Sequence, residues 1–116
     1  MDNQQFITVV KQACAEANLP AALNFLKQVD NQDIADAAEA LSGQFMLAEV
    51  DGEQRVYHTT FEPDDQGVET EYVEHIMNEG DETIVFVAWF FETQFDMKRK
   101  DVYAAAGRTY KQPKRN

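Results

Sequence analysis

The stretch from Gln44 to Phe61 constrains the fold most, because its residue types predict a β-hairpin. Its two halves, QFMLAEV and RVYHTTF, tend to alternate and are rich in β-branched and aromatic side chains. Between them lies DGEQ, and an Asp-Gly pair is a strong signal for a tight hairpin turn. We therefore expect an antiparallel pair of strands over residues 44–61.

The residues before this hairpin have the spacing of helices. A capping-box pattern at Asp2 begins the first helix, and Asn18, which is followed by a proline two residues later, begins the second. Asp30 or Asn31 can cap a third helix, which ends near Gly43. The apolar residues expected on the buried faces are Phe6, Val9, Val10, Ala13, Cys14, Ala17, Leu23, Leu26, Val29, Ile34, Ala37, Ala38 and Leu41.

Three more elements are predicted after the hairpin and the loop EPDDQG. Residues 68–80 have apolar residues at helical spacing, and residues 83–95 are apolar on both faces, which suits the central strand of a sheet. Asp96 can cap a final short helix through Ala106, which Gly107 closes. The residues expected on the inner face of the helix at 68–80 are Val68, Tyr72, Val73, Ile76 and Met77.

Together these patterns predict an α+β fold: three N-terminal helices, a hairpin, a helix and a central apolar strand in a small, mainly antiparallel sheet, then a short C-terminal helix. A chain of 116 residues with 44% hydrophobic residues is long enough for one domain with its own core, which we assign to residues 1–107. Residues 108–116 have no periodicity and are predicted to form a flexible basic tail.

The charge of the chain is unevenly distributed. Residues 1–97 hold three basic and twenty acidic residues, a net charge of −17, whereas residues 98–116 hold seven basic residues and one acid, a net charge of +6. A surface this negative repels phosphate and anionic lipid and attracts basic surfaces, although many acidic proteins are only well solvated. The basic residues of the C-terminal stretch are Lys98, Arg99, Lys100, Arg108, Lys111, Lys114 and Arg115.

The sequence predicts a cytoplasmic protein without a membrane segment. The longest apolar run, residues 84–91, is far too short to cross a bilayer. Cys14 is the single cysteine, so no internal disulfide can form, and its position on a buried helix face predicts core packing rather than reactivity.

Signals for catalysis or cofactor binding are weak. The single serine, Ser42, lies outside any nucleophile motif, and the five glycines are scattered, so there is no phosphate-binding loop. Glu71 and His75 are four residues apart on the predicted helix and can share a metal only if His58 also folds onto them. We therefore expect that the protein is not an enzyme and binds no cofactor or metal. The last alternative is a metal-dependent enzyme that uses His58, Glu71 and His75.

The aromatic cluster near the C-terminus has two interpretations. Its members most simply form the core, but a strand that is apolar on both faces can also pack against a second copy and bury Trp89 or Phe91 in a homodimer. The cluster comprises Phe86, Trp89, Phe90, Phe91 and Phe95.

The functional hypothesis therefore rests on the distribution of acidic residues. Two helix faces and the loop between them can form one acidic surface, comprising Asp33, Asp36, Glu39, Glu62, Asp64, Asp65, Glu71 and Glu74. Proteins that bind DNA carry Lys/Arg grooves, and an array of carboxylates can occupy such a groove. The composition therefore favours a non-enzymatic inhibitor of a basic partner, such as a nucleic-acid-binding protein or a nuclease. A phage- or mobile-element-type inhibitor of host defence and a toxin immunity protein are the concrete forms.

The alternative is a small structural or assembly protein, such as a virion or chaperone component, that acts by self-association. The basic tail can be merely solvated, or it can contact the acidic surface of its own chain, of a second copy or of a partner. Direct binding of nucleic acid is disfavoured, because the acidic body opposes the approach of phosphate.

Overall fold

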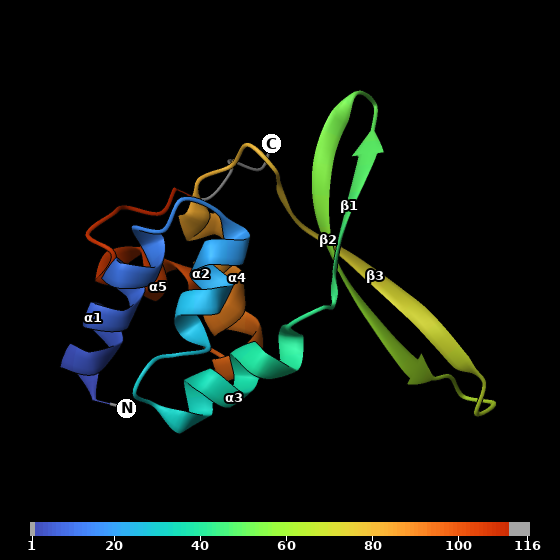
Figure 1. The fold of residues 1–116 in the computed structure, drawn as a ribbon, viewed down its shortest axis with the longest axis horizontal. Helices are drawn as coiled ribbons and strands as arrows, with labels where there is room; N and C mark the ends of the chain where they lie inside the picture. The colour runs from blue at the N-terminus through green and yellow to red at the C-terminus, as the bar shows by residue number, and fades with distance from the viewer. Residues whose placement is uncertain (1, 112–116) are drawn as a thin grey trace.

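Five helices and one three-stranded antiparallel sheet make up residues 2–111, the part of the chain that the computed structural model describes (Figure 1). The predicted α+β class is confirmed. The elements in chain order are α1 (Asn3–Cys14), α2 (Leu19–Leu26), α3 (Gln32–Leu41), β1 (Phe45–Val50), β2 (Glu53–Pro63), β3 (Glu69–Asn78), α4 (Thr83–Phe95) and α5 (Arg99–Ala105).

The three predicted N-terminal helices are confirmed, and each begins at a polar residue that caps it. In each case the side-chain oxygen accepts a hydrogen bond from the backbone N–H three residues later, which satisfies one of the unpaired donors of the first turn. Asp2 accepts from Gln5 at 2.7 Å, Asn18 from Ala21 at 3.0 Å and Asn31 from Ile34 at 3.1 Å. Asn31, and not Asp30, therefore caps the third helix.

The predicted hairpin is also confirmed, as the antiparallel pair β1–β2. Val50 pairs with Glu53 across the turn, and Asp51 and Gly52 both have positive φ, at 53° and 80°. This left-handed conformation is unfavourable for most residues and is tolerated by Asp and Gly, so the Asp-Gly pair determines where the strands turn.

The prediction of a helix over residues 68–80 is wrong, because this segment forms β3, paired antiparallel with β2. A β-bulge near Val56 gives β3 one extra residue, and the neighbouring side chains of Ile76 and Met77 are both buried. Two adjacent buried residues do not fit simple alternation, and in the sequence they resemble one face of a helix. Tertiary pairing with β2 overrides that local pattern.

The prediction of a central strand over residues 83–95 is also wrong, because this segment forms the helix α4. A continuous apolar run is compatible with a buried strand or a buried helix, and its periodicity does not distinguish the two. Here the helix is surrounded, since it contacts α1, α2, α5 and β3, and a helix enclosed in this way is apolar on all sides. Phe86, Phe90 and Phe91 are fully buried in it.

The predicted C-terminal helix exists as α5, but Asp96 does not cap it. Asp96 instead ends α4 in the left-handed conformation, with φ of 54°, and the next residue, Met97, donates its N–H to the carbonyl of Phe91 at 3.2 Å. Gly107 follows α5 with φ of 78°, as expected for a residue that closes a helix. None of the helices within residues 2–111 combines the length and apolar sequence required to cross a bilayer.

The helices form one body with the sheet at its side, and the two hairpins extend from that side in opposite directions (Figure 1). β1 pairs with β2 only as far as His58, whereas β3 follows β2 to its end at Pro63. We call residues 59–73, the part of the β2–β3 hairpin beyond β1, the arm. The Cα radius of gyration is 15.1 Å, compared with about 13 Å for a compact chain of this length, so the arm projects from the body.

Candidate functional site

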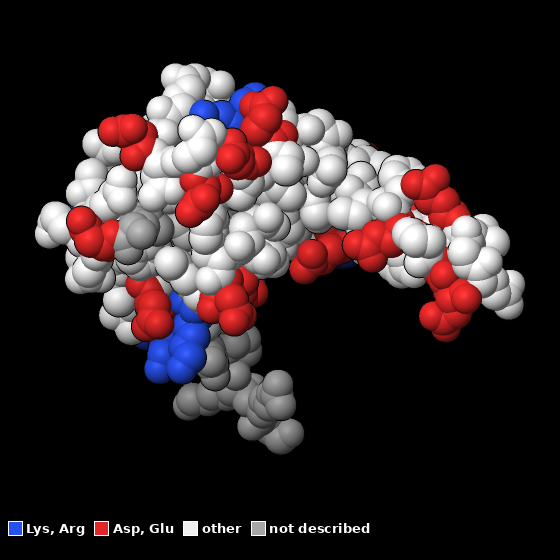
Figure 2. Space-filling view, turned by 90° about the horizontal axis from the view of Figure 1, so that it is seen from below, with Lys and Arg blue, Asp and Glu red and all other residues white. Residues whose placement is uncertain are grey.

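The eight carboxylates predicted to form one acidic surface lie in two separate groups. One group is on α3, in the helical body, and the other lies on the arm or at its base. Figure 2 shows acidic side chains along the projecting arm on the right and others scattered over the body on the left. The α3 group comprises Asp33, Asp36 and Glu39, and the arm group comprises Glu62, Asp64, Asp65, Glu71 and Glu74.

Two of the three carboxylates in the α3 group have partners within the chain. Asp36 accepts a hydrogen bond from the Gln32 side chain at 2.6 Å, and Glu39 pairs with Lys27 at 3.6 Å. All three carboxylates lie on an exposed helix face, so this group resembles an ordinary solvated surface.

Asp64 stabilises the turn at the tip of the arm. One carboxylate oxygen accepts the backbone N–H groups of Gln66 and Val68, both at 2.9 Å, and the other lies 3.5 Å from the Thr70 hydroxyl. These backbone hydrogen bonds hold the pKa of Asp64 below its usual value. Asp64 thus has a structural role that its place in the predicted acidic surface did not suggest.

The strand conformation of β3 separates two carboxylates that the sequence placed on one helix face. Glu71 lies opposite Phe61, and Glu74 lies opposite His58, three positions further along β3. Residues an odd number of positions apart in a strand point to opposite faces. Each face of the arm and its base therefore carries acid: Glu69 and Glu71 on one side, Glu62 and Glu74 on the other.

Large apolar side chains are exposed along the same arm, and the sequence pattern did not predict this exposure. Phe61 is 62% exposed, Val68 58%, Val73 50% and Tyr72 47%. Three of them were assigned to the inner face of a helix that does not exist. One signal was available: the turn-forming residues 63–67 are followed by Val68, Thr70, Tyr72 and Val73, which are residue types that favour a second strand.

The arm lies in a part of the chain that has no basic residue. Residues 56–97 contain eleven acidic residues and no lysine or arginine. The carboxylates of the arm are therefore not neutralised by neighbours in the chain, and they alternate with exposed apolar groups. A negative electrostatic field together with exposed apolar contact area is typical of a surface that docks onto another protein.

The base of the arm is fixed to the helical body through His58. The ring of His58 lies 5.0 Å from that of Trp89 and 5.5 Å from that of Phe45, and its Nε2 lies 3.1 Å from the Gln44 side-chain oxygen. Burial lowers the pKa of His58 below its usual value, although the nearby Glu74 acts in the opposite direction.

The predicted metal ligands do not come together. In a strand, four residues span about 13 Å, so Glu71 and His75 are not neighbours as they would be in a helix. His58 lies on the face opposite to both. Within the described residues, no group of three possible ligands lies close enough to hold a metal ion.

Trp89 and Phe91 are buried within α4. The predicted homodimer through an aromatic strand has no basis in this fold, because the element is a helix and both side chains belong to the core. Phe86, Phe90 and Phe91 confirm the favoured interpretation of this cluster, that it forms the core.

Cys14 packs against the same core, as predicted. Its burial raises the pKa of the thiol to about 11, although the charge of Arg108 acts in the opposite direction. At neutral pH the thiol is therefore protonated and a poor nucleophile.

Two of the basic residues that the structure describes near the C-terminus contact the body. Arg99 pairs with Glu92 at 2.9 Å, and Arg108 pairs with Glu82 at 2.6 Å. The ring of Tyr110 lies 4.9 Å from that of Tyr103. Lys98, Lys100 and Lys111 are exposed, and the predictions for Lys114 and Arg115 fall outside the described residues.

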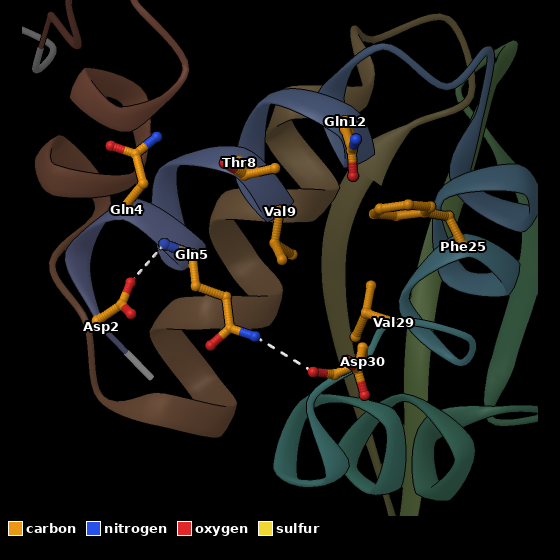
Figure 3. Close-up of a pocket in the computed structure, with 9 residues that line it drawn as sticks. All are labelled: Asp2, Gln4, Gln5, Thr8, Val9, Gln12, Phe25, Val29 and Asp30. Atoms are coloured by element: carbon orange, nitrogen blue, oxygen red, sulfur yellow. Dashed lines mark hydrogen bonds between the residues drawn. The ribbon is translucent and has the colours of Figure 1, made fainter.

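One open groove of about 550 Å³ lies between α1 and the end of α2, with Val9, Phe25 and Val29 among its lining residues (Figure 3). Gln5 reaches across it and donates to the backbone carbonyl of Asp30 at 3.2 Å. Gln5 thus ties α1 to the segment that precedes α3, which gives this side of the groove a structural role.

The arm is therefore the strongest candidate for a functional site. Comparison of the chain with protein-family models, with curated proteins and with solved structures found no match, so its function must be inferred from this geometry.

Proposed function

We propose that the protein is a non-enzymatic binding protein that neutralises a basic partner protein by docking its arm onto it. One observation carries the proposal: a projecting two-stranded ribbon presents uncompensated carboxylates together with Phe61, Tyr72 and Val73 in solvent. Isolated hydrophobic residues on a surface need no explanation, whereas several on one projecting element indicate contact with another molecule.

The two kinds of side chain have different roles in such a contact. Carboxylates on the arm attract a positive surface over a distance of about one Debye length and set the orientation of approach. The aromatic and aliphatic side chains then provide the buried contact area that holds the complex together. A groove lined with Lys and Arg, of the kind that binds nucleic acid or belongs to a nuclease, is the complementary surface. An arm bound in that groove excludes nucleic acid by mimicking its charge.

Two variants with the same change in charge test this function. The arm variant replaces Glu62, Glu69 and Glu71 by Gln, and the control variant replaces Asp33, Asp36 and Glu39 on α3 by the corresponding amides. Asp64 is left intact, because it holds the turn. Each variant is used, beside the wild type, to capture proteins from a lysate at 50 and 500 mM salt, after circular dichroism has shown that it is folded.

We expect the wild type and the α3 variant to capture a basic protein at low salt, and the arm variant to lose most of that capture. Equal losses in both variants would show that net charge alone acts. Capture that is unchanged in the arm variant, or that yields only acidic proteins, would contradict the proposed function.

Self-association is the second candidate, and one observation favours it. Met46 and Leu47 are exposed on β1, an edge strand of the sheet. Because each copy carries a net charge of −11, association between copies must strengthen with salt, whereas binding to a basic partner must weaken. Light scattering at both salt concentrations separates the two functions.

A further inference from the structure

We propose that an extended basic segment of the partner adds to the outer edge of β3 as a fourth strand of the sheet. This inference rests on the proposed function and specifies how the arm binds. The strand order is β1-β2-β3, so β3 is paired on one edge only. Its residues 69–75 are exposed, apart from the half-buried Thr70.

The hydrogen-bond phase shows which backbone groups face outward. Asp64 donates its N–H to the carbonyl of Val68 at 2.8 Å. In an antiparallel pair, hydrogen-bonded positions alternate with unbonded ones, so the next bonded residues of β3 are Thr70, Tyr72 and Glu74. The N–H and C=O groups that point away from β2 belong to Glu69, Glu71, Val73 and His75. None of these four has another backbone partner within residues 2–111.

The negative charge along β3 distinguishes between two possible occupants of this edge, a second copy of the chain and a basic segment of a partner. A second copy paired antiparallel through β3 would bring two sets of glutamates, at positions 69, 71 and 74, against each other, and like charges across strands are destabilising. A strand that alternates basic and apolar residues fits instead. Its basic side chains lie beside Glu69 and Glu71 on one face, and its apolar side chains lie beside Tyr72 on the other.

The other open edges are less suited to a basic strand. β2 beyond His58 is open on the side where β1 ends, but it terminates in Pro63, which has no N–H to donate. The outward-facing residues of β1 are Phe45, Leu47 and Glu49, which include a single acid. The outer edge of β3 is therefore the edge at which an open ladder coincides with the acidic field.

The test uses a ten-residue peptide of alternating lysine and valine and the full-length protein. A second peptide has the same sequence but is N-methylated at alternate residues, so it keeps every side chain and charge while losing the donors on one edge. The readout is backbone amide hydrogen exchange by NMR.

We expect the first peptide to slow exchange at least about tenfold at the four outward amides of β3, because a strand ladder shields amides that solvent otherwise reaches. Exchange at Thr70, Tyr72 and Glu74 should change little, since these amides are already bonded to β2. The N-methylated peptide should give no such protection.

Proline variants give a matched comparison within the protein. Val73→Pro removes an outward N–H that β2 does not use, and Leu47→Pro makes the same change on the outer edge of β1. We expect the first variant to abolish peptide-induced protection and the second to preserve it. If Val73→Pro does not fold, the comparison of the two peptides on the wild-type protein still decides the question.

Three results would overturn the strand-addition inference. Equal binding of both peptides would show that the arm acts by charge alone, which leaves the proposed function standing. Protection at Phe45, Leu47 and Glu49 would place the added strand on β1. Protection of the β3 edge that depends on protein concentration and needs no peptide would identify a second copy as the occupant. The proposed function itself fails if the Glu→Gln arm variant captures the same basic proteins as the wild type, or if only acidic proteins are captured.

Discussion

His58 connects the arm to the helical body, and its ionisation affects both. Its ring packs against Trp89 and Phe45, and Gln44 and Glu74 are the polar groups that face it. Burial among aromatic rings favours the neutral imidazole, which explains the lowered pKa.

We predict that mild acid destabilises the protein partly through His58. Between the lowered pKa of the folded state and 6.5, the unfolded chain binds more protons than the folded chain, so the free energy of unfolding falls as the pH falls through this window. Urea denaturation between pH 7.5 and 5.5 should show a steeper loss for the wild type than for His58→Gln. The titration of carboxylates is common to both proteins, so equal pH slopes would contradict the prediction.

At the scale of the elements, local signals predicted local structure. The first three helices and the first hairpin were predicted because Asp2, Asn18, Asn31 and the Asp51-Gly52 turn act through hydrogen bonds and φ angles a few residues away. Such signals can be recognised in a sequence because they do not depend on the rest of the fold.

The second half of the chain could not be predicted in this way, because its structure depends on distant partners. β3 is a strand because β2 is long enough to pair with it, and α4 is a helix because other elements enclose it. The candidate site was likewise predicted only in part. The sequence identified the carboxylates of the arm, but without β3 it could not show that Phe61 and Tyr72 share a projecting ribbon with them.

The contrast between α4 and the arm predicts that the same substitution, Phe to Ala, lowers the free energy of unfolding by very different amounts at the two sites. Phe86 is fully buried in α4, whereas Phe61 is 62% exposed on the arm. We expect Phe86→Ala to lower the free energy of unfolding by about 3–5 kcal/mol and Phe61→Ala to change it by less than about 0.5 kcal/mol. Guanidinium denaturation followed by circular dichroism measures both, and similar costs at the two sites would show that the arm is part of the core.

For the whole molecule, the main feature is the uneven placement of basic side chains, since acidic side chains lie on both the arm and the helical body. Acidic side chains line the projecting arm, while a group of lysine and arginine side chains lies on the helical body at the lower left of Figure 2. One basic residue of the C-terminal stretch is paired within the chain, because Arg108 donates a hydrogen bond to Glu82 at the start of α4. The pairing holds the pKa of Glu82 below its usual value. Arg108 thus has a partner within the chain.

The segment after α5 should therefore contribute to stability in two ways that salt can separate. The pair Arg108 and Glu82 is exposed, so the loss caused by Arg108→Gln should be small at low salt and absent in 1 M salt, where the Debye length is about 3 Å. Tyr110 packs on Tyr103, and an aromatic pair contributes about 0.5–1.5 kcal/mol that does not depend on ionic strength. Tyr110→Ala should lose stability in this range at both salt concentrations.

Denaturation of the two variants at low and high salt, beside the wild type, measures this difference. Arg108→Gln is the matched control for Tyr110→Ala, because the two residues lie in the same segment and differ in the kind of contact they make. A Tyr110→Ala protein as stable as the wild type would show that the segment is held only by charge. A loss in Arg108→Gln that persists in 1 M salt would show that Arg108 acts through packing, for instance through its aliphatic stem, rather than through its ion pair with Glu82.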